Sequence, residues 1–130
     1  MSVLEDRMYY GLKKVISDNT NLTAFSEFDT VRGAEYVYIE NTSIETILPG
    51  AGSSTFVGEF NIDYITNNKN KRTVRSNKSK LLECLADNTE YQTSTTHYYF
   101  NGVVVDIEHG EDGDPFEFRV FYQLTHTKVS

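Results

Sequence analysis

The sequence has no tryptophan, only two prolines and a single cysteine, Cys84, among its 130 residues. One cysteine cannot form an intramolecular disulfide, which excludes the disulfide framework of a small secreted domain. No run of about 18 apolar residues occurs, so we expect no helix that spans a membrane. The N-terminal residues lack a basic stretch followed by an apolar one, and we expect no signal peptide. These absences favour a chain that folds in a reducing cytosol, or in a particle assembled there.

The sequence does contain enough apolar residues for one core. Hydrophobic residues make up 38% of the chain, with nine Tyr and eight Phe. A chain of this length has the usual size of one domain and no linker divides it, so we expect a single domain over residues 1–130. The aromatic content fits a β-rich monomer and a β-rich domain with subunit interfaces equally well, because a half-covered Tyr ring has one apolar and one polar end.

The net charge of −7 is unevenly distributed. Residues 69–80, hereafter the basic segment, contain six of the twelve basic residues and no acidic one, which leaves six basic against nineteen acidic residues, or −13, elsewhere. The six are Lys69, Lys71, Arg72, Arg75, Lys78 and Lys80. The basic segment is typical of a solvated linker; its other interpretations are a docking surface for an acidic neighbour and a direct DNA contact. Aromatic residues that could stack on bases are not interleaved with these cations.

Two helices are predicted from apolar residues at helical spacing. The first spans about residues 2–17, begins with a capping box of Ser2 and Glu5, and has an apolar stripe of Leu4, Met8, Leu12, Val15 and Ile16. Residues 22–28 are then expected to pack irregularly over the core. The second helix spans about residues 77–86, after the basic segment, with a stripe of Leu81, Leu82, Leu85 and Ala86. Cys84 lies at the edge of this stripe and is expected to be a partly buried structural thiol.

Other segments alternate in the manner of strands. Strands are predicted at residues 34–40, 56–65 and 116–125, and the second has an aromatic face formed by Phe56, Gly58, Phe60, Ile62 and Tyr64. Asn101-Gly102 predicts a tight hairpin turn between strands at 98–100 and 103–107. The expected fold class is therefore α+β, with an antiparallel or mixed sheet and both helices, N-terminal and central, packed on one face.

Residues 41–55 predict a long mobile loop between the first two strands. Small residues and the Leu48-Pro49-Gly50 sequence give this segment many conformations to lose on folding. Long loops without internal structure are usually functional or disordered. We expect Ile47, Leu48, Pro49 and Gly50 to form a docking loop.

No combination of residues predicts a catalytic site. His97, His109 and His126 lie far apart in the sequence, and none has a metal-ligand spacing with Cys84. The sequence contains no glycine-rich phosphate loop, no Gly-x-Ser-x-Gly elbow and no His-Glu-x-x-His. We therefore expect no enzyme activity, no metal and no other cofactor.

Five carboxylates within nine residues form the densest acidic cluster: Asp106, Glu108, Glu111, Asp112 and Asp114. The order of ligands in an EF-hand is absent, which favours a solvated turn. An intersubunit salt-bridge surface and a divalent-ion site are the alternatives.

A metal-dependent nuclease would need two carboxylates and a lysine at the ends of adjacent strands. One loose combination is Asp106 with Glu117 and Arg119. Another is Glu59 with Asp63 and Lys69. Any acidic β protein offers combinations of this kind, so neither predicts a nuclease.

The predicted N-terminal helix and the loop between two strands are followed by three further stretches. These are residues 60–65 (Phe-Asn-Ile-Asp-Tyr-Ile), 75–85 and 116–122 (Phe-Glu-Phe-Arg-Val-Phe-Tyr). This order resembles the tail terminator proteins of tailed bacteriophages. The likeness covers most of the chain and is one of architecture, and related tail-tube and neck proteins share the same kind of fold.

The resemblance implies a viral structural protein, assembled in the cytoplasm of a bacterial host and located in the tail or neck of the virion. It implies a hexameric ring that completes the tail tube and joins it to the neck and the head-proximal connector. DNA would pass through the lumen without specific binding, which a negatively charged lumen favours. The implied partners are further copies, tail-tube proteins and neck proteins, with no membrane.

The residues expected at subunit interfaces are the six cations of the basic segment together with Asp106, Glu108, Glu111 and Asp112. Glu59, Asp63 and residues 43–55 are expected near ring or tube contacts. The alternative function is a small nucleic-acid-binding or nuclease-like domain that uses the basic segment. A cytosolic adaptor or accessory subunit is a third interpretation, which the sequence does not separate from the first.

Overall fold

The computed structural model of the chain describes residues 3–46, 55–67, 70–86, 89–92, 97–109 and 118–128. Their elements, in chain order, are α1 (Val3–Asn19), β1 (Ala24–Ser26), β2 (Glu35–Thr46), β3 (Thr55–Thr66), α2 (Lys71–Ala86), β4 (Thr89–Gln92), β5 (His97–His109) and β6 (Phe118–Lys128). The strands form one six-stranded sheet in the order β1-β2-β3-β6-β5-β4. Neighbours are antiparallel except β1 and β2, which are parallel. This is the predicted α+β class, with a mixed sheet.

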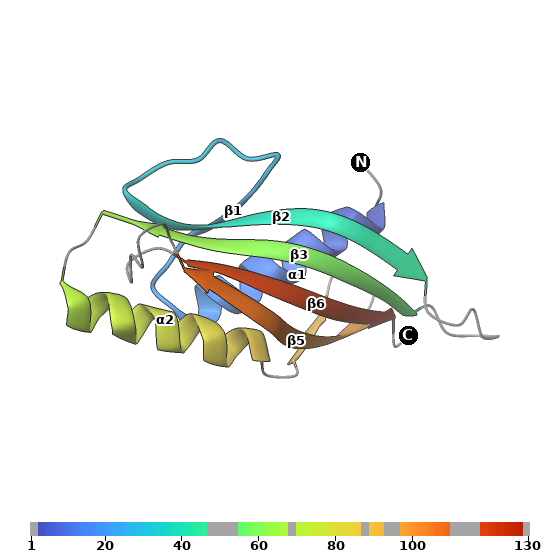
Figure 1. Cartoon of the computed structure of the whole chain (residues 1–130). Helices are drawn as coiled ribbons and strands as arrows, with labels where there is room; N and C mark the ends of the chain where they lie inside the picture. The colour runs from blue at the N-terminus through green and yellow to red at the C-terminus, as the bar shows by residue number, and fades with distance from the viewer. Residues whose placement is uncertain are drawn as a thin grey trace.

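Both helices pack on one face of the sheet, hereafter the helix face, and α1 crosses behind the strands in Figure 1. The strand register brings Ile39 of β2, Ile62 of β3 and Val120 of β6 side by side, each fully buried. The helical side chains in the same cluster include Met8, Leu12, Ile16, Leu81 and Leu85. Burying each such side chain contributes roughly 1.5–3 kcal/mol to folding. The predicted stripe of the first helix is confirmed from Met8 onward.

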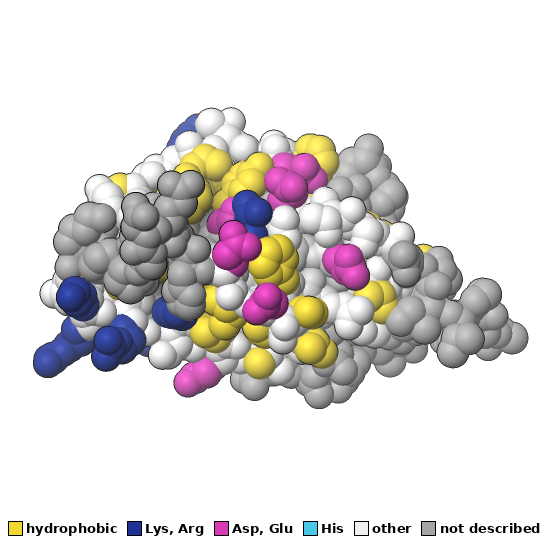
Figure 2. Space-filling model, in the orientation of Figure 1, with side chains coloured by type: hydrophobic (Ala, Val, Ile, Leu, Met, Phe, Trp, Pro, Cys, Tyr) yellow, Lys and Arg dark blue, Asp and Glu magenta, His cyan; other side chains and the backbone are white. Residues whose placement is uncertain are grey.

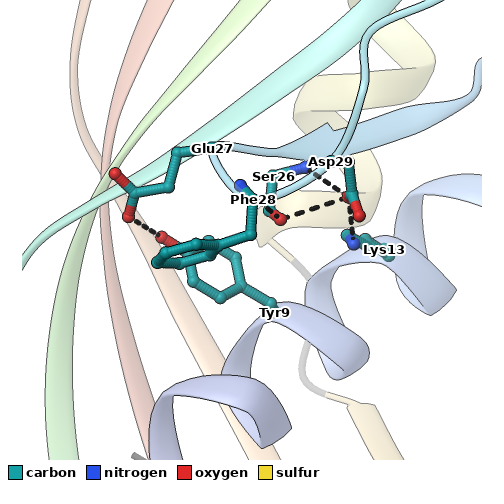
Figure 3. Close-up of polar contacts among 6 residues, drawn as sticks. All are labelled: Tyr9, Lys13, Ser26, Glu27, Phe28 and Asp29. Carbon is teal, nitrogen blue, oxygen red and sulfur yellow. Dashed lines mark hydrogen bonds and ion pairs between the residues drawn. The ribbon is translucent and has the colours of Figure 1, made fainter. Parts of the chain in front are cut away.

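Polar contacts fasten α1 to the segment that follows β1 (Figure 3). The Tyr9 hydroxyl donates to Glu27 Oε1 at 2.7 Å, and Lys13, one turn along α1, forms an ion pair with Asp29. Asp29 Oδ2 also accepts from the Ser26 amide at 2.8 Å and from the Ser26 hydroxyl at 3.1 Å. The Lys13 ammonium and the Ser26 amide hold the pKa of Asp29 below its usual value. These contacts fix the turn through which the chain passes from β1 towards β2.

Asn101 and Gly102 do not form a hairpin turn, so this prediction is wrong. Both residues lie inside β5, and Gly102 pairs with Leu124 of β6. A Cβ atom at Gly102 would lie 1.4 Å from the hydroxyl oxygen of Tyr122. Glycine inside a strand often marks a close approach of another group. Here the Tyr122 side chain occupies the position that a side chain at residue 102 would take. The Tyr122 hydroxyl donates to the Leu85 carbonyl, at the end of α2, at 2.6 Å.

Two predicted boundaries are also wrong. Helix α2 begins at Lys71 rather than near residue 77, so most of the basic segment is helical. Strand β2 continues to Thr46 and β3 begins at Thr55, which removes both ends of the predicted 41–55 loop. Cross-strand pairing, for example of Ile44 with Gly58, outweighs the polar composition there. The predicted docking loop, Ile47, Leu48, Pro49 and Gly50, lies outside the described residues.

The two edge strands were not predicted. Ala24–Ser26, within the segment expected to be irregular, forms β1 and pairs in parallel with Val37–Ile39 of β2. Thr89–Gln92 forms β4 and pairs with β5. Such short strands carry too few residues for an alternation to be recognised, and each becomes a strand by pairing with the next strand along the chain. Short edge strands also limit unwanted edge-to-edge pairing.

Candidate functional site: a basic helix and an acidic sheet face

Helix α2 begins with cations at the end of a helix where they are least favourable. Asn70 Oδ1 accepts hydrogen bonds from the amides of Arg72 at 3.1 Å and Thr73 at 3.2 Å, which makes Asn70 the N-cap. The first turn contains Lys71 and Arg72 and no acidic residue. A helix N-terminus carries partial positive charge, so each of these cations is unfavourable by an amount of about 0.3–1 kcal/mol at low ionic strength. Charges that oppose local stability in this way are typical of functional surfaces.

The cations of α2 are largely exposed and form the basic helix face, which comprises Lys71, Arg72, Arg75 and Lys80. In the part of the chain that the structure describes, none of these four forms an ion pair with a carboxylate. Lys78 differs, because it is half-buried and its Nζ lies 5.1 Å from the centroid of the Phe118 ring. Figure 2 shows Lys and Arg side chains gathered at the end of the molecule where α2 begins.

The position of α2 is fixed by hydrogen bonds to the sheet. Glu35 Oε2 accepts from the Tyr64 hydroxyl at 2.8 Å and from the Thr66 hydroxyl at 2.7 Å. Asn77 of α2 donates to Glu35 Oε1 at 3.4 Å. Burial raises the pKa of Tyr64, and the hydrogen bond from Asn77 acts in the opposite direction. Together with the contact of Tyr122 to the helix end, this network holds α2 so that its cations remain at the surface.

The opposite face of the sheet, hereafter the open face, is acidic. The strand register assigns to it five described carboxylates, those of Glu40, Glu59, Asp63, Asp106 and Glu108. The described cation on this face is Arg119, which binds Asp63 through two hydrogen bonds, from Nε at 2.7 Å and from Nη2 at 3.1 Å. In Figure 2 acidic side chains are spread among hydrophobic ones over this face.

Two side chains respond to the negative charge of the open face. Burial raises the pKa of Tyr38, and Glu40, Glu27 and Asp63 raise it further. The hydrogen bond to Asp63 raises the pKa of Arg119, and Glu108 and Glu40 add to this effect. Carboxylates on β2, β3 and β5 therefore act on side chains beyond the Arg119–Asp63 ion pair alone.

A hollow of about 390 Å³ opens in the middle of the open face. It lies between two β-bulges, one at Thr42 of β2 and one at Val105 of β5. Both bulges flank the same part of β3 and β6, where Asn61 pairs with Phe121. Bulges increase local twist and redirect side chains, which accounts for a depression at this level of the sheet. Its lining includes Thr42, Glu59, Val105, Asp106 and Phe121.

Apolar side chains border this hollow. Val103 is 53% exposed and Val105 is 64% exposed, and Phe121 is half-buried between them and β3. Exposed apolar groups that cluster and are rimmed by polar residues mark interaction surfaces. The open face thus combines an apolar strip with an excess of carboxylates, as a docking surface for a cationic partner would.

The structure places the predicted interface residues in two separate regions. Lys71, Arg72, Arg75, Lys78 and Lys80 lie on α2, whereas Asp106 and Glu108 lie on the open face at β5. Glu59 and Asp63, expected near ring or tube contacts, also lie on the open face. Lys69, Glu111 and Asp112 are outside the described residues.

The two loose nuclease combinations gain no support. Arg119 binds Asp63 and not Asp106, which pairs with Phe121 instead. Glu59 and Asp63 are four residues apart on one strand, roughly 13 Å, which is too far for both to hold one ion. Glu117 and Lys69 lie outside the described residues. Among the described side chains, no three His, Cys, Asp or Glu residues gather as a metal site.

Sequence reasoning missed the two bulges, the hollow between them and the pairing of Arg119 with Asp63. Nothing in the local sequence marks Thr42 or Val105 as an extra residue, because a bulge is defined by the partner strand. The N-cap could have been found, since Asn70 directly precedes the helix and Asn is among the preferred capping residues.

No protein-family model matches the chain, and no curated protein matches it. Neither of the two described helices is long and apolar enough to cross a membrane.

The buried thiol of Cys84 contacts the Leu81 carbonyl at 3.2 Å, in agreement with a structural role.

Proposed function

We propose that this protein is a structural subunit of a bacteriophage tail or neck. In this proposal, copies assemble into a ring that caps the tail tube and joins it to the head-proximal connector, and DNA passes through the lumen. The observation that carries the proposal is the presence, on one small domain, of two oppositely charged surfaces: a basic helix face whose four cations form no ion pair among the described residues, and an open face whose described carboxylates outnumber its described cation, Arg119. Lys71 and Arg72 lie where the helix dipole disfavours a cation, and the carboxylates of the open face are only partly neutralised by Arg119. Neither arrangement stabilises an isolated domain.

The hexameric number and the position in the virion come from the family resemblance. The α+β architecture, with both helices on one sheet face, agrees with that resemblance. The net charge of −7 also agrees with a lumen through which DNA slides without sticking.

The proposal is tested by measuring the mass and shape of the purified protein. Size-exclusion chromatography with light scattering, followed by electron microscopy, is expected to show rings. A monomer that persists at high concentration, and that has no affinity for tail-tube protein, would contradict the proposal.

The second candidate is a nucleic-acid-binding domain, which the exposed cations at the start of α2 favour. Phosphates would be attracted both by these cations and by the helix N-terminus. This candidate predicts binding to duplex DNA that weakens steeply with salt and that is reduced by Arg72→Ala and Arg75→Ala. The acidic open face, which would repel the same DNA, favours the first candidate.

A further inference from the structure

The basic helix face and the open face lie on different layers of the domain. The cations are on α2, which packs on the helix face (Figure 1), and the strand register places the carboxylates on the other side of the sheet. Neither surface is complementary to itself, because each carries charge mainly of one sign. A contact between two copies that uses both surfaces is therefore head-to-tail, with a different surface contributed by each copy.

The open face suits cations with long apolar stems. Glu59 and Asp106 line the hollow, while Val105 and Phe121 provide apolar surface in the same place. Arginine and lysine side chains lay their methylene groups along apolar surface and keep the charged head in contact with polar groups. The guanidinium groups of arginine also form paired hydrogen bonds with carboxylates.

We propose that the basic helix face of one copy docks on the open face of the next, with Arg72 and Arg75 directed at the carboxylates of Glu59 and Asp106. The occupant of the hollow is thus a second copy of this chain. This inference rests on the proposed ring and specifies the contact that builds it. A head-to-tail contact whose rotation closes produces a ring, and each copy in that ring uses both of its charged surfaces once.

Charge reversal on each surface tests the contact. The helix variant is Arg72→Glu/Arg75→Glu and the face variant is Glu59→Lys/Asp106→Lys; all four side chains are exposed. Either variant alone is expected to raise the dissociation constant for assembly roughly tenfold or more, because like charges then meet at the contact. Circular dichroism and thermal unfolding establish that each variant is folded.

Mixing the two variants provides the decisive comparison. Each contact in the mixture can again join opposite charges, in alternating order, so an even-numbered ring is expected to reappear. The chain that carries all four changes is likewise expected to assemble by itself. The control is Lys14→Glu/Arg32→Glu, two exposed cations that lie neither on α2 nor on the sheet; Lys14 pairs with Asp18 within α1, so thermal unfolding is measured for this variant too. This control makes the same charge change as the helix variant and is expected to assemble like the wild type.

The outcomes separate this inference from the proposed function. Wild-type rings with unchanged assembly of both variants would overturn the contact and leave the ring standing. Failure of the mixture and of the fourfold variant to assemble would also overturn this pairing. A wild-type protein that stays monomeric overturns the ring and the contact together. If the helix variant abolishes binding to a duplex DNA oligonucleotide but assembles normally, α2 is a DNA-binding surface and the proposed contact is wrong.

Discussion

Individual residues decide how the two layers of this domain meet. Gly102 has no side chain, which leaves room for the Tyr122 ring to reach from β6 to the end of α2. Burial strongly raises the pKa of Tyr122, so its hydroxyl remains a hydrogen-bond donor throughout the physiological pH range. At the other side of the sheet Arg119 and Asp63 neutralise each other, and the remaining carboxylates of the open face keep their net negative charge available.

Replacing Gly102 by alanine is expected to lower the free energy of unfolding by about 1–3 kcal/mol, because the new methyl group overlaps the Tyr122 hydroxyl. Urea denaturation measures this change. Val103→Ala, on an exposed position of the same strand, is the control and is expected to change the free energy by about 0.5 kcal/mol or less. Equal effects of the two substitutions would contradict the packing described here.

Asp29 makes a pH-dependent contribution to stability. Its pKa is lowered from the ordinary 3.8 in the folded state, so the contribution is fully present above that value and is lost as the pH falls through the lowered pKa. Wild type is therefore expected to be more stable than Asp29→Asn at pH 6, with the difference shrinking as the pH falls below 3.8 and through the lowered pKa. The side chain is 37% exposed, so this difference is at most about 1 kcal/mol. Denaturation curves at several pH values measure it, and a difference independent of pH would exclude this role for Asp29.

At the scale of elements, sequence periodicity predicts the amphipathic helices and strands. It fails for segments whose structure depends on pairing with another strand. Helix α1 and strand β3 were recognised because their apolar residues recur with the period of the element. The start of α2 was missed because residues 71–76 contain one buried apolar side chain, Val74. The Asn101-Gly102 turn was wrongly predicted because pairing with β6 overrides a local preference. The sequence named the four cations of the basic helix face and four of the five open-face carboxylates as interface candidates, but not Glu40. The hollow was not predicted because it depends on bulges in two strands far apart in sequence.

Lys71→Glu is expected to stabilise the isolated domain and weaken assembly at the same time. An acidic residue in the first turn interacts favourably with the helix dipole, by about 0.3–1 kcal/mol at low salt. The same change introduces a negative charge opposite the open face of the next copy. Urea unfolding of dilute protein and light scattering of concentrated protein measure the two effects. Lys80→Glu, in the interior of α2, is the control and should weaken assembly without the gain in stability; equal stabilisation by both would disprove the dipole effect.

At the scale of the whole molecule, the domain is a negative body with one positive helix. That asymmetry gives each copy a direction, and a head-to-tail contact between such copies builds a ring where its rotation closes and an open filament where it does not. Because the contact is largely between exposed charges, it is expected to be sensitive to salt. The distance over which charges interact falls from about 10 Å at 0.1 M salt to about 3 Å at 1 M.

Rings are therefore expected to dissociate as sodium chloride rises from 0.1 M to 1 M, while the monomers stay folded. Sedimentation velocity at a series of salt concentrations measures the change. The variant with all four charges exchanged is expected to respond to salt in the same way as the wild type, since the same number of pairs is present. Assembly that is unaffected by salt would assign the contact to apolar surface instead.

The mass of the purified wild-type protein at micromolar concentration in 0.1 M salt, measured by size-exclusion chromatography with light scattering, decides whether copies of this chain assemble. We expect one closed assembly of about six times the 14.9 kDa chain mass, seen as a ring by electron microscopy. A single species of 14.9 kDa that persists at high concentration would contradict it.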